Sequence, residues 1–434
     1  MKKILAFITM SILAIACARA VILLDTGDPT VNVSAPTGTL ANSGWQFEGT
    51  WGGFLGTPIA PHFFISAAHI GQAGGIFSYQ GSNYTPIRAF SLPNSDLLIW
   101  QVKETFPNFA PLFSKSDEVG RHLVVIGRGT ERGGEVMLNG TPRGWNWGSG
   151  TGIERWGEND VVDLVPYLGH DLVYATFDQH ELPNDRPNES HLSGGDSGGA
   201  VFLNDNGTWK LAAINFAVDD LYSAPASSSQ FTATIFDARG FYTFDGTNFT
   251  QITSTAAVPT GFYSSRISSE LAWIGGVIAE PQVGREGNFI TLTYTKLNVP
   301  SSEVTYVVQQ SNDLVSWSTA TTQDDLVSSN GDLQTIKAKV DMGTWPRLFL
   351  RLQITRPTQL SHATASFIET VAIDNGIDVF ARAGEVDVGQ KIFRRDHRGL
   401  AAGPTLRAAR AGVVLGQRKW DGVRLKLPVL DSPR

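Results

Sequence analysis

Short runs of alternating apolar and polar residues, separated by glycine and asparagine, follow one another along most of the chain. Residues 45–51 read Trp-Gln-Phe-Glu-Gly-Thr-Trp, and further glycines follow at once. Alternation with a period of two is typical of a strand with one buried face, and glycines mark the turns between strands. Similar strands are expected over residues 87–92, 97–103, 123–128, 161–166, 172–177, 200–204, 209–216 and 231–236. Many short strands at this spacing predict an all-β barrel or sandwich.

The pattern changes twice after residue 260. Residues 262–274 place apolar side chains at 263, 267, 271 and 274, which predicts an amphipathic helix that closes a domain spanning residues 45–277. Alternation then returns at 289–295, 304–310, 333–340 and 347–354. These four runs predict a small β-sandwich module over residues 282–357. Residues 21–44 show no periodicity, and we expect them to be an irregular lead-in.

Composition narrows the class of function. The chain has 434 residues, 42% of them hydrophobic, a net charge of −7 and a pI near 5.6. This acidic balance argues against a nucleic-acid-binding protein. Residues 358–434 differ, because they hold 12 Lys+Arg and 8 Asp+Glu, a net of +4, against 22 and 33, a net of −11, in residues 1–357. The interleaved acids favour a poorly ordered extension over a polyanion contact for this basic tail.

The first 20 residues resemble a secretory signal. Two lysines precede an apolar run over residues 4–16, and Ala18-Arg19-Ala20 forms an Ala-x-Ala cleavage site. The run is too short to span a bilayer, so we expect an exported protein, secreted or periplasmic, without an integral membrane segment after cleavage. Cys17 is the only cysteine, and cleavage would leave a mature chain without disulfides. A lipoprotein anchored at Cys17 is the alternative, although no leucine stands three residues before it.

A glycine-rich stretch near the middle of the chain carries the candidate chemistry. Residues 193–202 read Ser-Gly-Gly-Asp-Ser-Gly-Gly-Ala-Val-Phe. Glycines on both sides of Ser197 allow positive φ angles and a close approach to a substrate. The Ser197 hydroxyl could attack a carbonyl while the amides of Gly195 and Ser197 bind its oxygen. Alone, this stretch is equally typical of an ordinary turn.

Two other stretches favour a catalytic loop over an ordinary turn. Residues 63–69 read Phe-Phe-Ile-Ser-Ala-Ala-His, and residues 94–100 read Asn-Ser-Asp-Leu-Leu-Ile-Trp. With the glycine-rich stretch, in the order His, Asp, Ser, they resemble the trypsin/chymotrypsin-like serine peptidases, here of a secreted, bacterial, disulfide-free type. The resemblance covers about residues 45–277. It implies His69 as general base, Asp96 as its orienting partner, Ser197 as nucleophile, and the Gly195 and Ser197 amides as oxyanion hole. It also implies two six-stranded β-barrels with the site between them.

The resemblance extends to substrate binding. It implies that Asn215, Phe216 and Ala217 belong to the strand that pairs with the substrate backbone. His191 falls at the base of the primary specificity pocket, where a protonated imidazole would disfavour Lys and Arg; an ordinary loop histidine is the alternative. The Asp219-Asp220 pair is expected to be solvated rather than to bind calcium.

The acid beside the nucleophile raises a question of activation. In the resembled family this residue, Asp196 here, pairs with a new N-terminal ammonium, yet an Ile-Val-Gly-Gly start is missing from this chain. Signal cleavage after Ala20 would expose Val21 instead. Side chains or backbone amides are the alternative partners of Asp196.

These observations predict an exported serine endopeptidase that acts on proteins or peptides without a cofactor. None of the eight histidines forms a His-Glu-x-x-His motif, which argues against a zinc peptidase. The alternative is a catalytically silent adhesion or binding protein in which the C-terminal module contacts a surface or matrix. Because the candidate triad precedes residue 277, removal of residues 282–434 is expected to leave the hydrolysis of short peptides nearly unchanged.

Overall fold

The structure is a computed structural model. It describes residues 21–356 except 151, 181, 183–184, 220, 226–228, 245–246 and 346, together with two backbone strands at 366–374 and 379–382. The expected signal segment and most of the basic tail lie outside the described residues. No helix in the described part of the chain is long and apolar enough to cross a membrane.

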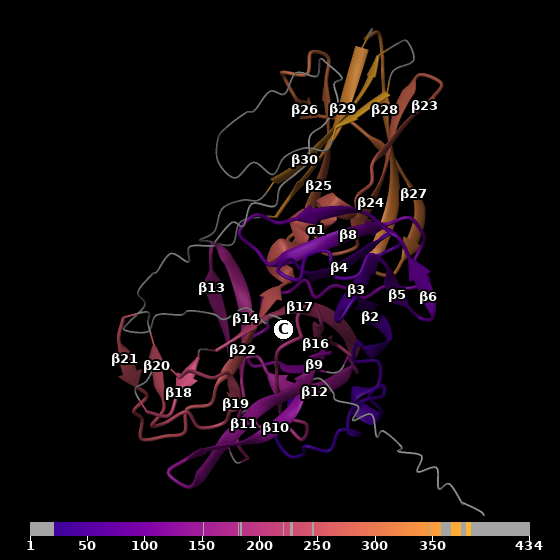
Figure 1. Ribbon diagram of the computed structural model, residues 1–434. Coiled ribbons are helices and arrows are strands. Elements are labelled where there is room, and N and C mark those ends of the chain that lie inside the picture. The colour runs from indigo at the N-terminus through magenta and orange to yellow at the C-terminus, as the bar shows by residue number, and fades with distance from the viewer. Residues whose placement is uncertain are drawn as a thin grey trace, which may run out of the picture.

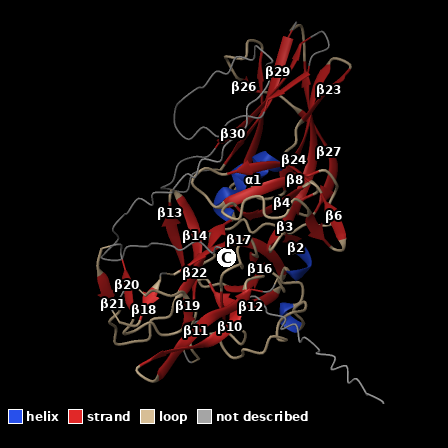
Figure 2. Ribbon diagram, viewed as in Figure 1, coloured by secondary structure: helices blue, strands red, loops and turns tan. Residues whose placement is uncertain are grey.

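Antiparallel strands dominate the fold, and a first large sheet follows the lead-in (Figure 2). Its strand order is β6-β5-β2-β3-β4-β8-β7. The strands are β2 (Gly49–Trp51), β3 (Phe54–Ala60), β4 (Phe63–Ala67), β5 (Phe77–Tyr79), β6 (Ser82–Tyr84), β7 (Pro86–Ser91) and β8 (Leu97–Val102). All five residues of β4 are buried, so this strand is covered on both faces.

The second large sheet carries the nucleophile stretch, and its order is β12-β9-β16-β17-β22-β14-β13. Its strands are β9 (His122–Gly127), β12 (Arg155–Asp160), β13 (Asp163–Tyr167), β14 (His170–Thr176), β16 (Ala200–Asp205), β17 (Thr208–Val218) and β22 (Gly261–Arg266). Aliphatic side chains such as Val125, Val173 and Val201 form its core. Each large sheet has seven strands, one more than the six implied for each barrel.

Smaller elements surround the second sheet. Strand β1 (Ile22–Leu23) pairs with β15 (Ser190–His191). One three-stranded sheet contains β10 (Thr130–Leu138), β11 (Thr141–Gly150) and β19 (Ala233–Ile235), and another contains β18 (Tyr222–Ser223), β20 (Tyr242–Phe244) and β21 (Phe249–Gln251). The 3-10 turns are η1 (Gly38–Leu40), η2 (Trp45–Phe47) and η3 (Ser268–Glu270). The strand expected over residues 45–51 is therefore strand only from Gly49.

The closing helix is shorter than expected and begins later. Helix α1 spans Leu271–Ile278, whereas the expected helix began at residue 262. Residues 261–266 instead form β22, which pairs with β14 on one side and β17 on the other. Backbone pairing with two distant strands overrides a local helical spacing, because every residue of β22 is buried and needs partners for its backbone groups.

Two further sheets make up the C-terminal sandwich. One contains β23 (Gln282–Glu286), β24 (Phe289–Leu297), β28 (Leu333–Asp341) and β27 (Gln323–Asn330), in that order. The other contains β26 (Ser318–Thr319), β25 (Thr305–Ser311), β29 (Arg347–Thr355), β30 (Ser366–Asp374) and β31 (Val379–Arg382). This latter sheet of the sandwich extends past residue 357, the end expected for the module, because β30 pairs with β29.

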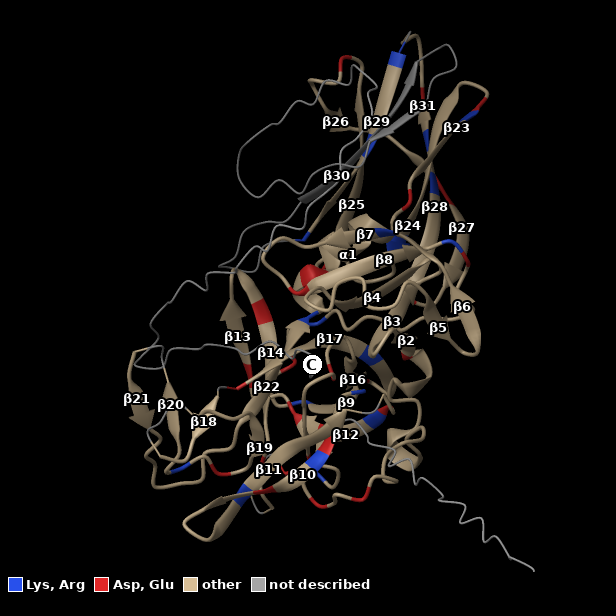
Figure 3. Cartoon of the chain, viewed as in Figure 1, with Lys and Arg blue, Asp and Glu red and all other residues tan. Residues whose placement is uncertain are grey.

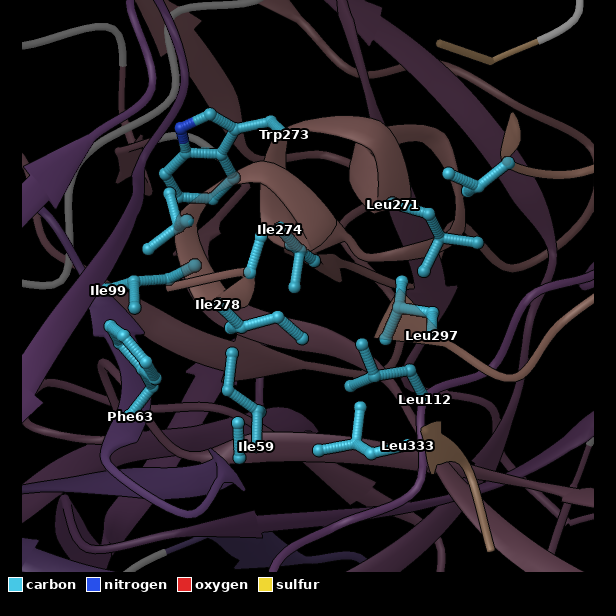
Figure 4. Close-up of a cluster of buried hydrophobic side chains, with 14 of the residues drawn as sticks. Ile59, Phe63, Ile99, Leu112, Leu271, Trp273, Ile274, Ile278, Leu297 and Leu333 are labelled. Atoms are coloured by element: carbon cyan, nitrogen blue, oxygen red, sulfur yellow. The ribbon is translucent and has the colours of Figure 1, made fainter. Parts of the chain in front are cut away.

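One hydrophobic core joins the first sheet, α1 and the sandwich. All eight residues of α1 are buried, as in a helix surrounded by apolar neighbours. Figure 4 shows Ile274 and Ile278 of α1 between Phe63 of the first sheet and Leu297 of the sandwich, with Trp273 of the same helix above them, and all five belong to one buried cluster. Figure 1 places α1 where the sandwich meets the first sheet. The fold is thus all-β, with two large antiparallel sheets, a short helix and a β-sandwich.

Charged positions are scattered over both large sheets and the sandwich (Figure 3). The ion pair between Glu118 and Arg266 lies in the interior. Glu118 is fully buried, and Arg266 of β22 binds its two carboxylate oxygens at 2.8 Å each. Arg266 also reaches Asp171 of β14 at 3.0 Å, so it ties the strands that precede the closing helix.

Candidate active site

The structure brings the three candidate catalytic residues together. Nε2 of His69 lies 2.7 Å from Oγ of Ser197, and Nδ1 lies 2.7 Å from Oδ2 of Asp96. The two sheets supply different members, because His69 and Asp96 come from the first and Ser197 from the second. A hydroxyl, an imidazole and a carboxylate in this line can transfer a proton away from the hydroxyl.

The ends of two neighbouring strands position the base and its acid. His69 follows β4 and Asp96 precedes β8, and these strands are paired from Phe63 to Ala67. Oδ1 of Asp96 also accepts the amide of His69 at 2.8 Å, so both carboxylate oxygens hold the same residue. Burial raises the pKa of Asp96, and its hydrogen bonds with His69 oppose that shift.

Backbone conformation shapes the loop around Ser197. Gly195 and Gly198 have φ angles of 96° and 76°, in the region that favours glycine. A Cβ at Gly198 would lie 2.3 Å from Oγ of Ser66, which leaves no room for a side chain. The nucleophile loop therefore packs directly against β4. The convergence of the Gly195 and Ser197 amides on a substrate oxygen stays a prediction.

Asp196 is fully buried and held by four donors. Oδ2 accepts the amide and the hydroxyl of Ser193 at 2.7 and 3.0 Å, while Oδ1 accepts the amide of Gly129 at 2.7 Å. The fourth donor is the Val21 nitrogen, 3.4 Å from Oδ1. Burial raises the pKa of Asp196 to about 6, against the effect of these donors. Asp196 is therefore bound by backbone amides and one hydroxyl, the partners named as the alternative to an ammonium, and the amide of Val21 is among them.

The start of the described chain is packed into the second sheet. Val21 and Ile22 have no exposed surface, and Ile22 pairs with His191. Buried Arg155 donates to the carbonyl of Val21 at 3.3 Å, and Arg132 donates to that of Leu24 at 2.9 Å. The lead-in, expected to be irregular, thus begins with a docked strand directed at Asp196.

The expected substrate-binding strand lies beside the nucleophile. The Asn215 side chain donates to the carbonyls of Ile126 and Asp196 at 2.9 and 3.1 Å, so it holds the nucleophile loop. The Phe216 ring packs against His69 at 6.0 Å between centroids. Pairing of β17 with β16 ends at Ile214, and the backbone of Asn215 bonds to Gly198 and Gly199 of the nucleophile loop. Among the described strands, the residues of β17 beyond Asn215 therefore pair with β22 alone.

His191 is buried between aromatic rings, with the Leu192 carbonyl oxygen 2.6 Å from Nδ1 and the Thr260 hydroxyl 3.4 Å from Nε2. It has no exposed surface, and its ring packs edge-to-face on Phe177 and Phe262. Burial lowers the pKa of His191 to about 4, so the ring is neutral at neutral pH. We expected a protonated His191 to repel substrate cations, and this expectation is wrong because desolvation keeps the ring uncharged. A place in the pocket lining stays a prediction.

Asp219 is not the solvated loop acid that we expected. Oδ1 accepts the hydroxyl of Tyr263 at 2.7 Å, and Oδ2 accepts the Tyr174 hydroxyl at 3.0 Å and the Gly261 amide at 2.7 Å. These three donors join the end of β17 to β14 and β22. Asp220 lies outside the described residues.

Three contributors to the site escaped the sequence reasoning. Ser193 binds Asp196, the Tyr167 ring packs at a tilt against Phe216 with 5.6 Å between centroids, and His170 approaches the Asp96 turn. The serine stood inside the motif already singled out, whereas Tyr167 and His170 lie between the strands expected at 161–166 and 172–177, where no motif pointed to them. Among the described residues, no group of three or more His, Cys, Asp or Glu could hold a metal ion.

Comparisons with known proteins add little to this geometry. No family model and no curated protein match the chain. Among solved structures, it is similar to an inactive mutant form of Rv3671c from M. tuberculosis H37Rv, with 16% identity, 56% of this chain and 95% of that chain covered, and a TM-score of 0.29. An inactive form of the Rv3671c protease aligns at 15% identity over 46% of this chain and 91% of that chain, with a TM-score of 0.26.

Proposed function

We propose that the chain is a serine endopeptidase that hydrolyses peptide bonds through an acyl-enzyme. The observation that carries this proposal is the continuous line from Ser197 through His69 to Asp96, with 2.7 Å at both steps. These distances suit proton transfer and need no rearrangement of the three side chains.

The reaction requires the His69 tautomer in which Nδ1–H donates to Asp96 and Nε2 accepts the Ser197 hydroxyl. Ser197 Oγ attacks the substrate carbonyl while Nε2 of His69 takes its proton. Asp96 keeps Nδ1–H in place and stabilises the imidazolium that forms. His69 then protonates the leaving amine, and water repeats the sequence on the acyl-enzyme. The Gly195 and Ser197 amides are proposed to stabilise the oxyanion.

An extended substrate fits the unpaired side of β17. Residues 216–218 extend past the pairing with β16 and past the contacts of Asn215 with the nucleophile loop, and a peptide could add there as an antiparallel strand. The Phe216 ring would contact substrate side chains on the N-terminal side of the scissile bond. The substrates are therefore proposed to be unfolded or extended protein segments.

The mature enzyme is proposed to begin at Val21. Cleavage after Ala20 would convert the Val21 nitrogen, 3.4 Å from Asp196, into an ammonium. A positive charge at that point would compensate the buried carboxylate better than an amide does. Export, to the periplasm or the exterior, is part of the same proposal, and the sandwich would remain available for a surface or matrix contact.

The alternative is a silent binding protein on the same fold. It has no use for a carboxylate whose two oxygens both hold His69, so the geometry favours the enzyme.

A fluorophosphonate probe and a mixed peptide library test the proposal together. The protein that begins at Val21 should be labelled at Ser197 and should cut library peptides, whereas Ser197→Ala should do neither. A folded protein that is neither labelled nor active would leave the binding protein as the better conclusion.

A further inference from the structure

The tip of the β13–β14 hairpin reaches from the second sheet to the turn that carries Asp96. His170, the first residue of β14, places Nε2 at 2.9 Å from the carbonyl oxygen of Pro93 and Nδ1 at 3.0 Å from Oε1 of Glu270. Pro93 stands three residues before Asp96, and Glu270 directly precedes α1. One imidazole therefore links the second sheet, the first sheet and the closing helix beside the triad.

Both partners of this ring can only accept hydrogen bonds. A carbonyl oxygen has no proton, and neither has an ionised carboxylate. A neutral imidazole has one N–H, so its other nitrogen would direct a lone pair at an oxygen about 3 Å away. The imidazolium donates to both. The geometry therefore suits the charged ring.

The surroundings favour that charge. The side chains of His170 and Glu270 are 19% and 9% exposed, so water screens the pair only partly. The hydrogen bond to Glu270 raises the pKa of His170, against the effect of burial. The charged groups that act on the ring are Glu270 before α1 and Asp171 on the hairpin. Each of these carboxylates has a cationic neighbour, Arg356 after β29 for Glu270 and Arg266 on β22 for Asp171. Arg266 already binds Asp171, which leaves Glu270 as the principal partner of His170.

The turn that His170 contacts is held firmly at Asp96 and more weakly around Pro93. The Asp96 carbonyl oxygen accepts the Ala68 amide at 2.6 Å. Around Pro93, the Ser95 amide donates to the Leu92 carbonyl at 3.2 Å and the Leu92 amide to the Leu97 carbonyl at 3.4 Å, and Asn94 has a φ of 63°. The contact of His170 with Pro93 is shorter than these last two bonds. A tether from the second sheet would therefore limit the movement of this turn relative to Ser197.

We propose that His170 is a positioning residue whose imidazolium holds the Pro93 carbonyl and thereby keeps Asp96 aligned on His69. The proposal rests on the proposed function, because it assigns this role within the same triad. His170 does more than connect three elements, because it donates to both Pro93 and Glu270 only while its ring is charged.

The pH dependence follows from the direction of the shift. A histidine with a raised pKa keeps both bonds below that pKa and loses one of them as the pH rises through it. Catalysis needs neutral His69 and charged His170 at once. The alkaline limb of kcat is therefore set by His170.

Four proteins test this, namely the wild type, His170→Gln, His170→Arg and His62→Gln, with kcat and KM measured from about pH 6 to pH 10. His170→Gln should lower kcat roughly tenfold near neutral pH, with little change in KM, as expected for the loss of a charge-assisted bond. His170→Arg keeps a permanent charge, so it should retain most of kcat and remove the alkaline decline.

His62 is the matched control. Its nitrogens lie 3.2 Å from Glu280 Oε2 and 3.0 Å from Thr105 Oγ1, and a hydroxyl can donate as well as accept. A neutral ring satisfies both partners, so His62→Gln should leave the pH profile of kcat unchanged. Equal profiles for wild type, His170→Gln and His170→Arg would overturn the proposal.

Histidine-selective ¹⁵N NMR separates this inference from the proposed function. Two protonated nitrogens on His170 at pH 7, and a changed His69 Nδ1–H signal in His170→Gln, would uphold the positioning role even if no peptide were cut. A single protonated nitrogen, or an unchanged His69 signal, would refute it whatever the activity.

Discussion

At the scale of single residues, the site depends on carboxylates with more than one task. Asp96 divides its two oxygens between the amide and the ring of His69, at 2.8 and 2.7 Å. An amide in its place would offer one oxygen and one NH₂, so one of these contacts would become repulsive. Asp96 therefore controls the tautomer of the base as well as its orientation.

Asp96→Asn should lower kcat/KM by about 10³- to 10⁴-fold without unfolding the protein, because the imidazole would present the wrong tautomer to Ser197. Initial rates on a library-derived peptide measure the loss, and circular dichroism checks the fold. Asp117→Asn is the control, since it alters only an ion pair with Arg121 in which Asp117 is 57% exposed. A loss of similar size in the control would show that the assay reports stability.

Burial of His191 predicts a pH-dependent stability. Its pKa of about 4 lies below the usual value of 6.5, so the neutral ring contributes stability above pH 6.5 that is lost as the pH falls towards 4. The shift corresponds to about 3 kcal/mol. In a Ser197→Ala background, His191→Gln should flatten the fall in urea midpoint between pH 7 and pH 4.5. An unchanged slope would mean that other groups cause the acid sensitivity.

At the scale of elements, β1 is the piece whose role depends most on its neighbours. Two residues of strand would be marginal alone. Pairing with β15, the two arginine contacts and the Val21–Asp196 contact hold it against the second sheet. The nucleophile loop is therefore coupled to the first residue after the proposed cleavage site.

Two extra residues ahead of Val21 should lower kcat/KM by roughly tenfold or more, because they keep a neutral amide beside the buried Asp196. Trimming the extension with an aminopeptidase should restore the rate. The measurement compares the extended, trimmed and native-start proteins on one peptide substrate. Equal rates in all three would eliminate the ammonium–Asp196 pair.

At the scale of the whole molecule, the shared core changes the outcome expected of truncation. Side chains of the first sheet, α1 and the sandwich belong to one buried cluster. Removal of residues 282–434 would expose apolar surface of α1 and of the first sheet to water, with a loss that scales with the uncovered area. We therefore expect the truncated protein to lose stability and, through it, activity.

Ile278→Ala provides a milder test of this coupling. Ile278 is 1% exposed in the shared cluster, and its truncation should cost about 2–5 kcal/mol of unfolding free energy and lower the thermal midpoint of the sheets and the sandwich together. Leu326→Ala is the control, because Leu326 is 58% exposed on β27. Two separate transitions, with only the sandwich affected, would show that the parts fold independently.

Patterns within a few residues were enough to predict several elements. The strands expected at 97–103 and 200–204 correspond to β8 and β16, because alternation and turn residues act locally. The helix expected from 262 failed at β22, where two distant strands compete for the backbone. Local spacing cannot register partners that approach from elsewhere in the chain.

The sequence by itself determined the all-β class and the three residues proposed for catalysis, since each lies in a short motif with its own chemistry. Only the tertiary structure decided that Val21 reaches Asp196 across 175 positions, that His170 contacts Pro93 across 77, and that α1 shares its core with both flanking parts. The physical reason is that burial, protonation and restraint depend on which groups meet in space. His170, for example, takes its role from two acceptors that are distant from it in the sequence, and no pattern near His170 in the chain indicates either of them.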